Sequence, residues 1–168
     1  LVILLFITIV LAIFELAMVM LAYVTLDQAT QTAGRQIRTG EFQTRSANSQ
    51  VDFKALVCSR MSWLAAQCAT SAYVDVRTFS TFGGDTGLAA NLAQGASAFN
   101  PKKTCFTAGG PTDIVLVRTY FKWRLFTPFL DGAMENMGPG SGMRLLSSAT
   151  AFRNEPYNQS PPVGASKC

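Results

Sequence analysis

Histidine is absent from this chain of 168 residues, and only 14% of the residues are charged. Without imidazole, the sequence excludes a Ser-His-Asp triad, a Cys-His pair and any metal site that relies on histidine. The four cysteines show no C-x-x-C spacing, which argues against zinc held by four thiolates. Basic residues are scattered along the sequence, so no basic cluster indicates nucleic-acid binding. We therefore predict no catalytic residue, no cofactor and no metal ligand, and expect that the protein is not an enzyme.

Lysine and arginine are also missing from the first 26 residues. The run from Leu1 to Leu26 is interrupted only by Thr8, Glu15 and Thr25. About 20 apolar residues in a helix cross the hydrocarbon core of a bilayer, so this run predicts a membrane span. A cleaved signal peptide is the alternative, but its apolar region usually has only ~7–15 residues behind a basic leader.

Glu15 is the one residue of this run that favours a functional interpretation. A carboxylate well inside a span costs about 2.5–3.5 kcal/mol on insertion scales, so it normally faces a partner or a polar path. We predict that Glu15 pairs with another membrane helix. The simpler alternatives are that it lies nearer to the interface or is protonated.

The helix is predicted to continue beyond the membrane. Apolar residues recur at helical spacing on one face, at Ala22, Leu26, Ala29, Ala33 and Ile37. Gly40 follows as a C-terminal cap. The small residues Ala22, Ala29 and Ala33 would let another chain or the globular domain pack closely. We therefore expect residues 1–26 in the membrane and residues 27–40 as the outer half of one rod.

Residues 41–168 are predicted to form a small globular domain with an irregular C-terminal tail. Ser49 and Asp52 have the spacing of a helix-capping box, which predicts a second helix. Alternating or β-branched stretches predict strands over 73–79, 113–123 and 144–152. Long Gly-rich segments at 83–112 and 127–142 are expected to be surface excursions. The fold class is therefore α+β, with a long helix packed on a small antiparallel sheet.

All four cysteines lie beyond the predicted span, at positions 58, 68, 105 and 168. An even number in a small domain suits two disulfides, and we predict the pairs Cys58–Cys68 and Cys105–Cys168. The first pair requires the second helix to end near Trp63–Ala66 and the chain to fold back. Four reduced, buried thiols are the alternative. Disulfides favour the periplasm, although Arg35 and Arg38 alone would place this side in the cytoplasm.

Seven short stretches, spread in order over nearly the whole chain, are similar to one protein family. They are Ile13-Phe14-Glu15, Arg35-Gln36-Ile37-Arg38-Thr39-Gly40, Val57-Cys58-Ser59-Arg60, Tyr73-Val74-Asp75-Val76-Arg77-Thr78-Phe79, Asp113-Ile114-Val115-Leu116-Val117-Arg118, Leu125-Phe126-Thr127-Pro128 and Phe152-Arg153-Asn154-Glu155-Pro156. With the architecture, they resemble type IV pilins and pseudopilins. The particular resemblance is to the TadE-like family, the pseudopilins of bacterial tight-adherence pilus systems.

The resemblance implies a non-enzymatic minor pilin that helps to initiate or assemble an adhesion pilus. Such a subunit is processed by a prepilin peptidase, here upstream of Leu1, and crosses the bacterial inner membrane once with its domain in the periplasm. The implied partners are a sister pseudopilin (TadF-like), the major pilin and the inner-membrane assembly platform. Glu15 matches the family's mid-span acid and not its processing-site glutamate. Incorporation into the pilus itself is left open.

An alternative function stays open from the sequence. A single-span, membrane-anchored periplasmic binding module of another envelope complex would have the same gross architecture. A deep apolar pocket with convergent polar groups would support this alternative. A membrane-tethered hydrolase is disfavoured by the lack of histidine.

Overall fold

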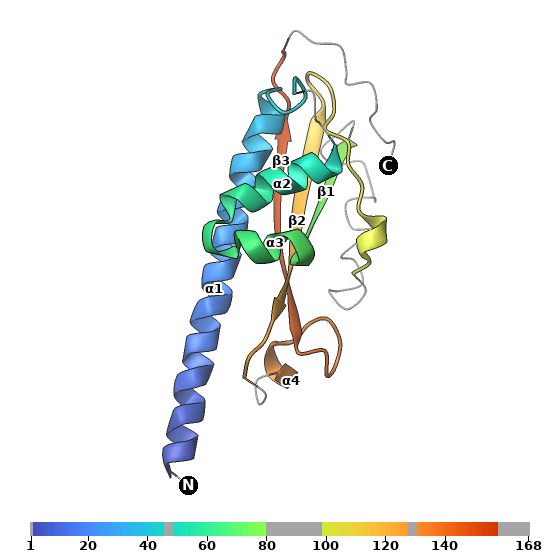
Figure 1. Cartoon of the computed structure of the whole chain (residues 1–168). Coiled ribbons are helices and arrows are strands. Elements are labelled where there is room, and N and C mark those ends of the chain that lie inside the picture. Colours follow the sequence, from blue (N-terminus) through green and yellow to red (C-terminus); the bar gives the residue numbers. More distant parts are fainter. Residues whose placement is uncertain (1, 46–48, 80–98, 128–130, 158–168) are drawn as a thin grey trace.

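The chain folds as one long helix laid across a three-stranded antiparallel sheet, which confirms the predicted α+β class (Figure 1). The computed structural model describes residues 2–45, 49–79, 99–127 and 131–157. Helix α1 spans Val2–Arg38, and the strands β1 (Ala72–Phe79), β2 (Ile114–Arg124) and β3 (Met143–Arg153) pair in the order β1-β2-β3. The described elements also include α2 (Gln50–Arg60), η1 (Ser62–Leu64), α3 (Ala65–Ser71), η4 (Pro101–Lys103) and α4 (Asp131–Met134).

Helices α1, α2 and α3 cover one face of the sheet, and the opposite face is buried over part of its area (Figure 1). Side chains of alternating strand positions, such as Val76 and Val117, meet the helices in the main core. The opposite face holds a smaller cluster of Phe99, Tyr120 and Leu145. β2 is therefore buried continuously from Val115 to Phe121, including the polar residues Arg118 and Thr119.

The described part of the 83–112 excursion is not a simple surface loop, so that expectation was wrong there. After η4 the chain returns beside β1, where the Val76 amide donates to the Cys105 carbonyl and the Thr107 amide donates to the Val76 carbonyl, both at 2.8 Å. The ring of Phe106 then packs against Phe42 and Phe53. An apolar ring at the right point in the segment thus brings it back to the core. Residues 80–98 lie outside the described residues.

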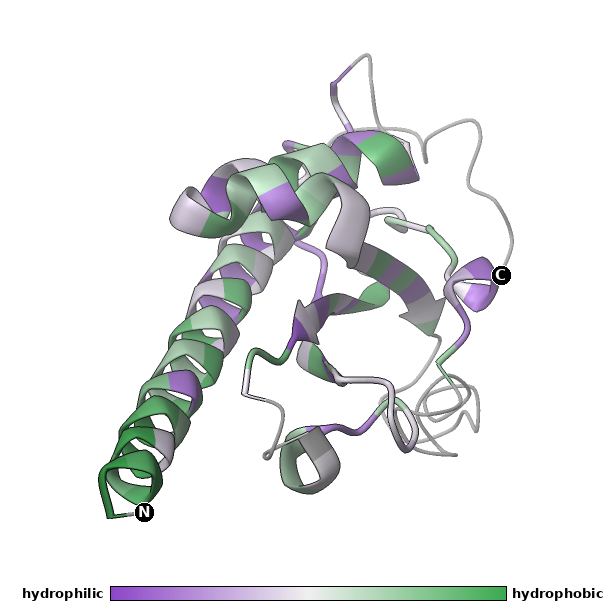
Figure 2. Ribbon diagram, turned by 60° about the horizontal axis from the view of Figure 1, so that its bottom comes forward, coloured by the Kyte–Doolittle hydropathy of each residue, from purple (hydrophilic) through white to green (hydrophobic). Residues whose placement is uncertain are grey.

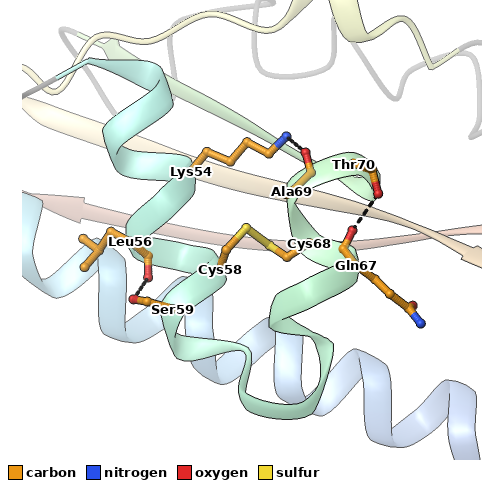
Figure 3. Close-up of a disulfide and its surroundings, with 8 residues drawn as sticks. All are labelled: Lys54, Leu56, Cys58, Ser59, Gln67, Cys68, Ala69 and Thr70. Atoms are coloured by element: carbon orange, nitrogen blue, oxygen red, sulfur yellow. Dashed lines mark hydrogen bonds between the residues drawn. A yellow bond between two sulfur atoms is a disulfide. The ribbon is translucent and has the colours of Figure 1, made fainter.

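The second helix begins as predicted but ends earlier. The Ser49 hydroxyl accepts from the Asp52 amide, and the Asp52 carboxylate accepts from the Ser49 amide. Helix α2 stops at Arg60 instead of near Trp63–Ala66, because Ser62 takes a left-handed backbone conformation and the chain reverses through η1. Helix α3 then runs back beside α2, joined to it by the Cys58–Cys68 disulfide (Figure 3).

This disulfide confirms the first predicted pair. The second predicted pair stays a prediction, since Cys168 lies outside the described residues. Lys54 adds a further link between the two short helices, because its ammonium group donates to the Ala69 carbonyl at 2.7 Å (Figure 3). The short helices therefore form a braced layer over the sheet.

We predict that removing this disulfide weakens the domain without changing its fold. The double variant Cys58→Ala/Cys68→Ala opens a loop of sequence separation 10. Loop-closure entropy then lowers the free energy of unfolding by about 2–3 kcal/mol. Chemical denaturation in detergent measures this loss against the untreated wild type. Equal stability of variant and wild type, or full thiol labelling of untreated protein, would contradict the prediction.

A second prediction concerns the close contact between α1 and the sheet. Ala33→Leu overfills a site with no exposed surface and should lower the free energy of unfolding by about 1–3 kcal/mol. The matched control is Thr32→Leu, one residue earlier on the exposed side of α1, which should change stability by no more than about 0.5 kcal/mol. Thermal denaturation in detergent measures both, and equal effects would contradict the packing described here.

Candidate functional site

Helix α1 carries a continuous buried seam along most of its length. Its buried positions recur at spacings of three and four, at Glu15, Val19, Ala22, Leu26, Ala29, Ala33 and Ile37. This is the spacing of a helix face that packs on a neighbour. The seam confirms the face predicted from Ala22 onward and extends it toward the N-terminus by Val19 and Glu15. The domain thus contacts the helix inside the segment that the sequence assigns to the membrane.

The seam is lined by small residues because the helix lies very close to the sheet. Ala22, Ala29 and Ala33 are fully buried in the core that α1 shares with the sheet. At Gly34 an added Cβ would come within 3.1 Å of both Phe152 and Thr150. Of the two neighbours that the sequence allowed for these alanines, the structure shows the chain's own domain. These three residues have almost no exposed surface in the folded chain.

Glu15 has its partner inside its own chain. Its carboxylate accepts hydrogen bonds from the backbone amides of Phe126, at 2.5 Å, and Thr127, at 3.0 Å, at the end of β2. Only 2% of the Glu15 surface is exposed. The structure therefore differs from the expected pairing with another membrane helix. The sequence could not indicate this partner, because backbone amides 111 and 112 positions away carry no residue signature.

Other polar contacts fix the position of α1 along the sheet. The Ser148 hydroxyl donates to Asp27 at 2.7 Å, and the hydroxyls of Thr30 and Thr119 lie within hydrogen-bonding distance of each other. Such contacts are lost if the helix slides or rotates, because each joins one position on α1 to one on a strand. The sequence did not indicate these contacts, since Asp27 and Thr30 resemble ordinary surface residues of a helix.

The opposite side of α1 is free of the domain. Its exposed positions, which we call the free face, are Val10, Phe14, Ala17, Leu21, Val24 and Gln28. Figure 2 shows that apolar residues gather on the end of α1 that projects away from the sheet. α1 is the only helix of the described residues that is long and apolar enough to cross a membrane. A helix of 37 residues rises about 55 Å.

Two hollows on the described part of the domain surface do not have the features of a ligand site. One hollow of about 480 Å³ lies over the disulfide between α2 and α3, lined mainly by alanines and Val51. Its lysine, Lys54, is already bound to the Ala69 carbonyl. Another, of about 580 Å³, lies beside Arg35 and Arg38, and Arg38 pairs with Glu155 at 3.3 Å. Within the described ranges, no group of three or more histidine, cysteine, aspartate or glutamate side chains is placed to hold a metal ion.

The model of the TadE-like protein family matches residues 1–35. The match confirms the resemblance in the part of the chain that includes the apolar half of α1, Glu15 and the alanines of the seam. The match covers 35 of the 168 residues. No match was found among curated proteins or among solved structures.

We predict that Glu15 holds the end of β2 against the helix. In Glu15→Leu the amides of Phe126 and Thr127 lose their acceptor inside the protein, which should cost about 1–3 kcal/mol and raise hydrogen exchange at both amides. The control Phe14→Leu changes an exposed neighbour and should leave exchange there unaltered. Amide exchange of the detergent-solubilised chain measures this. Wild-type exchange rates in Glu15→Leu would contradict the assigned contact.

Proposed function

We propose that this chain is a membrane-anchored minor pilin, or pseudopilin, that helps to initiate or assemble a bacterial tight-adherence pilus. The observation that carries the proposal is the division of α1 into a seam packed on its own domain and a free face that is mostly apolar. The family match over this same helix supports it. The function is one of anchoring and contact, and it requires no catalytic group.

In this proposal α1 anchors the subunit in the inner membrane and the domain lies in the periplasm. Residues 1–26 form the membrane half of the helix, residues 27–40 its outer half, and residues 41–168 the globular domain. The Cys58–Cys68 disulfide supports the periplasmic assignment, because disulfides persist in oxidising compartments and are rare in the cytosol. The protein then spans the membrane once.

The free face is the surface that we assign to other subunits. Within a membrane, helices associate through close packing and not through the hydrophobic effect, since lipid tails are as apolar as leucine. Ala17 is a small, exposed residue in the middle of this face and allows such an approach. The proposed partners are a sister pseudopilin of the TadF-like kind, the major pilin and the inner-membrane assembly platform. A prepilin peptidase would act upstream of Leu1.

Site-specific photocrosslinking in the cells that make this protein tests the proposal. A benzophenone side chain at Leu21, on the free face, should form covalent adducts with another small membrane-anchored pilin-like subunit. The matched control is a benzophenone at Val51, which is 74% exposed on α2 and outside the free face. Mass spectrometry identifies the adducts.

The outcome separates the proposal from its alternative. Pilin-like partners at Leu21 but not at Val51 would support an assembly subunit whose free face is the contact surface. Adducts with lipid alone at Leu21, in cells that are making pili, would contradict it. Adducts at Val51 with a protein that is not pilin-like would favour a binding module of another envelope complex.

A further inference from the structure

The domain meets α1 at a depth that the apolar run places inside the membrane. Glu15 lies 11 residues before Leu26, or about 16 Å along the helix, and yet the end of β2 contacts it there. On the other side of the helix, Leu16, Met20, Leu21 and Val24 are all exposed over the same 16 Å. A bilayer that covers these four side chains also reaches the end of β2. The domain and the lipid therefore share this length of the helix.

The end of the domain that lies at this depth carries exposed aromatic rings. Phe126 is 69% exposed and Trp63 is 44% exposed, and both contact Trp123, with ring centroids 5.8 and 6.1 Å apart. The indole N–H of Trp63 points to α1 and donates to Thr25 at 3.3 Å. Aromatic side chains with one apolar and one polar end are typical of the membrane–water interface.

The backbone amides of residues 125–127 also have partners inside the protein, as a segment in lipid requires. A loop in lipid must satisfy its own amide groups. The amide of Leu125 donates to the Gly142 carbonyl at 2.9 Å, and the next two amides, of Phe126 and Thr127, donate to Glu15. Three consecutive amides are thus satisfied inside the chain. The same contact gives Glu15 the partner that a carboxylate at this depth requires.

We propose that the segment Trp123–Thr127 enters the interfacial layer of the bilayer beside α1, with the Phe126 ring among the upper parts of the lipid acyl chains. The inference rests on the proposed membrane anchoring. The driving force is apolar and comes from the exposed rings of Phe126 and Trp63. The domain sits partly in the membrane surface instead of above it.

Fluorescence quenching by brominated lipids tests this with the full chain. The protein is reconstituted in vesicles of phosphatidylcholine and phosphatidylglycerol whose acyl chains carry bromine. The parent is Trp63→Phe, whose remaining tryptophan, Trp123, lies in the proposed segment and is 4% exposed. The quenching of the parent is therefore measured first and subtracted from that of each variant. Added to this parent, Phe126→Trp reports on the loop, Phe6→Trp on the projecting half of α1, and Val51→Trp on the outer domain.

Val51 is a matched control because it is exposed to a similar degree but lies far from the loop. Its neighbour Gln50 donates to the Val74 carbonyl, and Val74 pairs with Thr119. Phe126 lies seven residues beyond Thr119, or about 23 Å along an extended chain. We expect strong quenching in Phe126→Trp and Phe6→Trp and little in Val51→Trp. The wild type, which keeps Trp63, should be quenched more than the parent, and this tests the inference without a change at Phe126.

Any other quenching result among the three variants would contradict the inference, and each result has a different meaning. Quenching in Phe6→Trp alone, with Phe126→Trp and wild-type Trp63 as unquenched as Val51→Trp, would place the loop in water while leaving the anchor intact. Equal quenching in all three variants would show that the domain lies on lipid without using this loop. No quenching in any of them would refute the membrane anchor, and with it the proposed function.

Discussion

Helix α1 packs against the protein's own sheet on one side and is exposed on the other, and the rest of the structure depends on this constraint. The seam of α1 packs on the protein's own sheet, while the free face meets whatever lies outside the chain. A close approach of helix and sheet needs small residues, which explains Ala22, Ala29, Ala33 and Gly34. The sequence allowed these alanines to contact either another chain or the chain's own domain. Their use inside the chain leaves the opposite face exposed, and this is the face that we assign to other subunits.

Glu15 marks the place where these two surroundings meet. An acidic residue in an apolar run suggested a partner helix, because helices are the usual neighbours within a membrane. The structure instead provides two backbone amides from the end of β2. These hydrogen bonds give the Glu15 carboxylate its donors and the two loop amides their acceptor. They also bring the domain to a part of the helix that the apolar pattern alone assigns to lipid. Residue 26, the predicted end of the membrane half of the helix, therefore marks where the apolar run ends. It does not mark where contacts with the domain begin.

The domain is rigid enough to present such an end because its small layers are braced in several ways. Cys58–Cys68 and the Lys54 contact join α2 to α3, and the capping box fixes where α2 begins. At the far end of α1, Gly40 has a positive φ of 76°, and the Glu155 amide donates to the Arg38 carbonyl. The helix is thus held to the sheet near both ends of the seam.

The sequence by itself determined the features that depend on local pattern. The apolar run, the seam from Ala22 to Ile37, the Ser49 cap, the Gly40 cap, the three strands to within one residue at each end, and the Cys58–Cys68 pair all follow from spacing and side-chain type. Tertiary structure decided the partner of Glu15, the neighbour of the alanines, the early end of α2 and the return of Phe106 to the core. These depend on segments far apart in the chain, and backbone amides that bind a distant carboxylate leave no trace in the sequence.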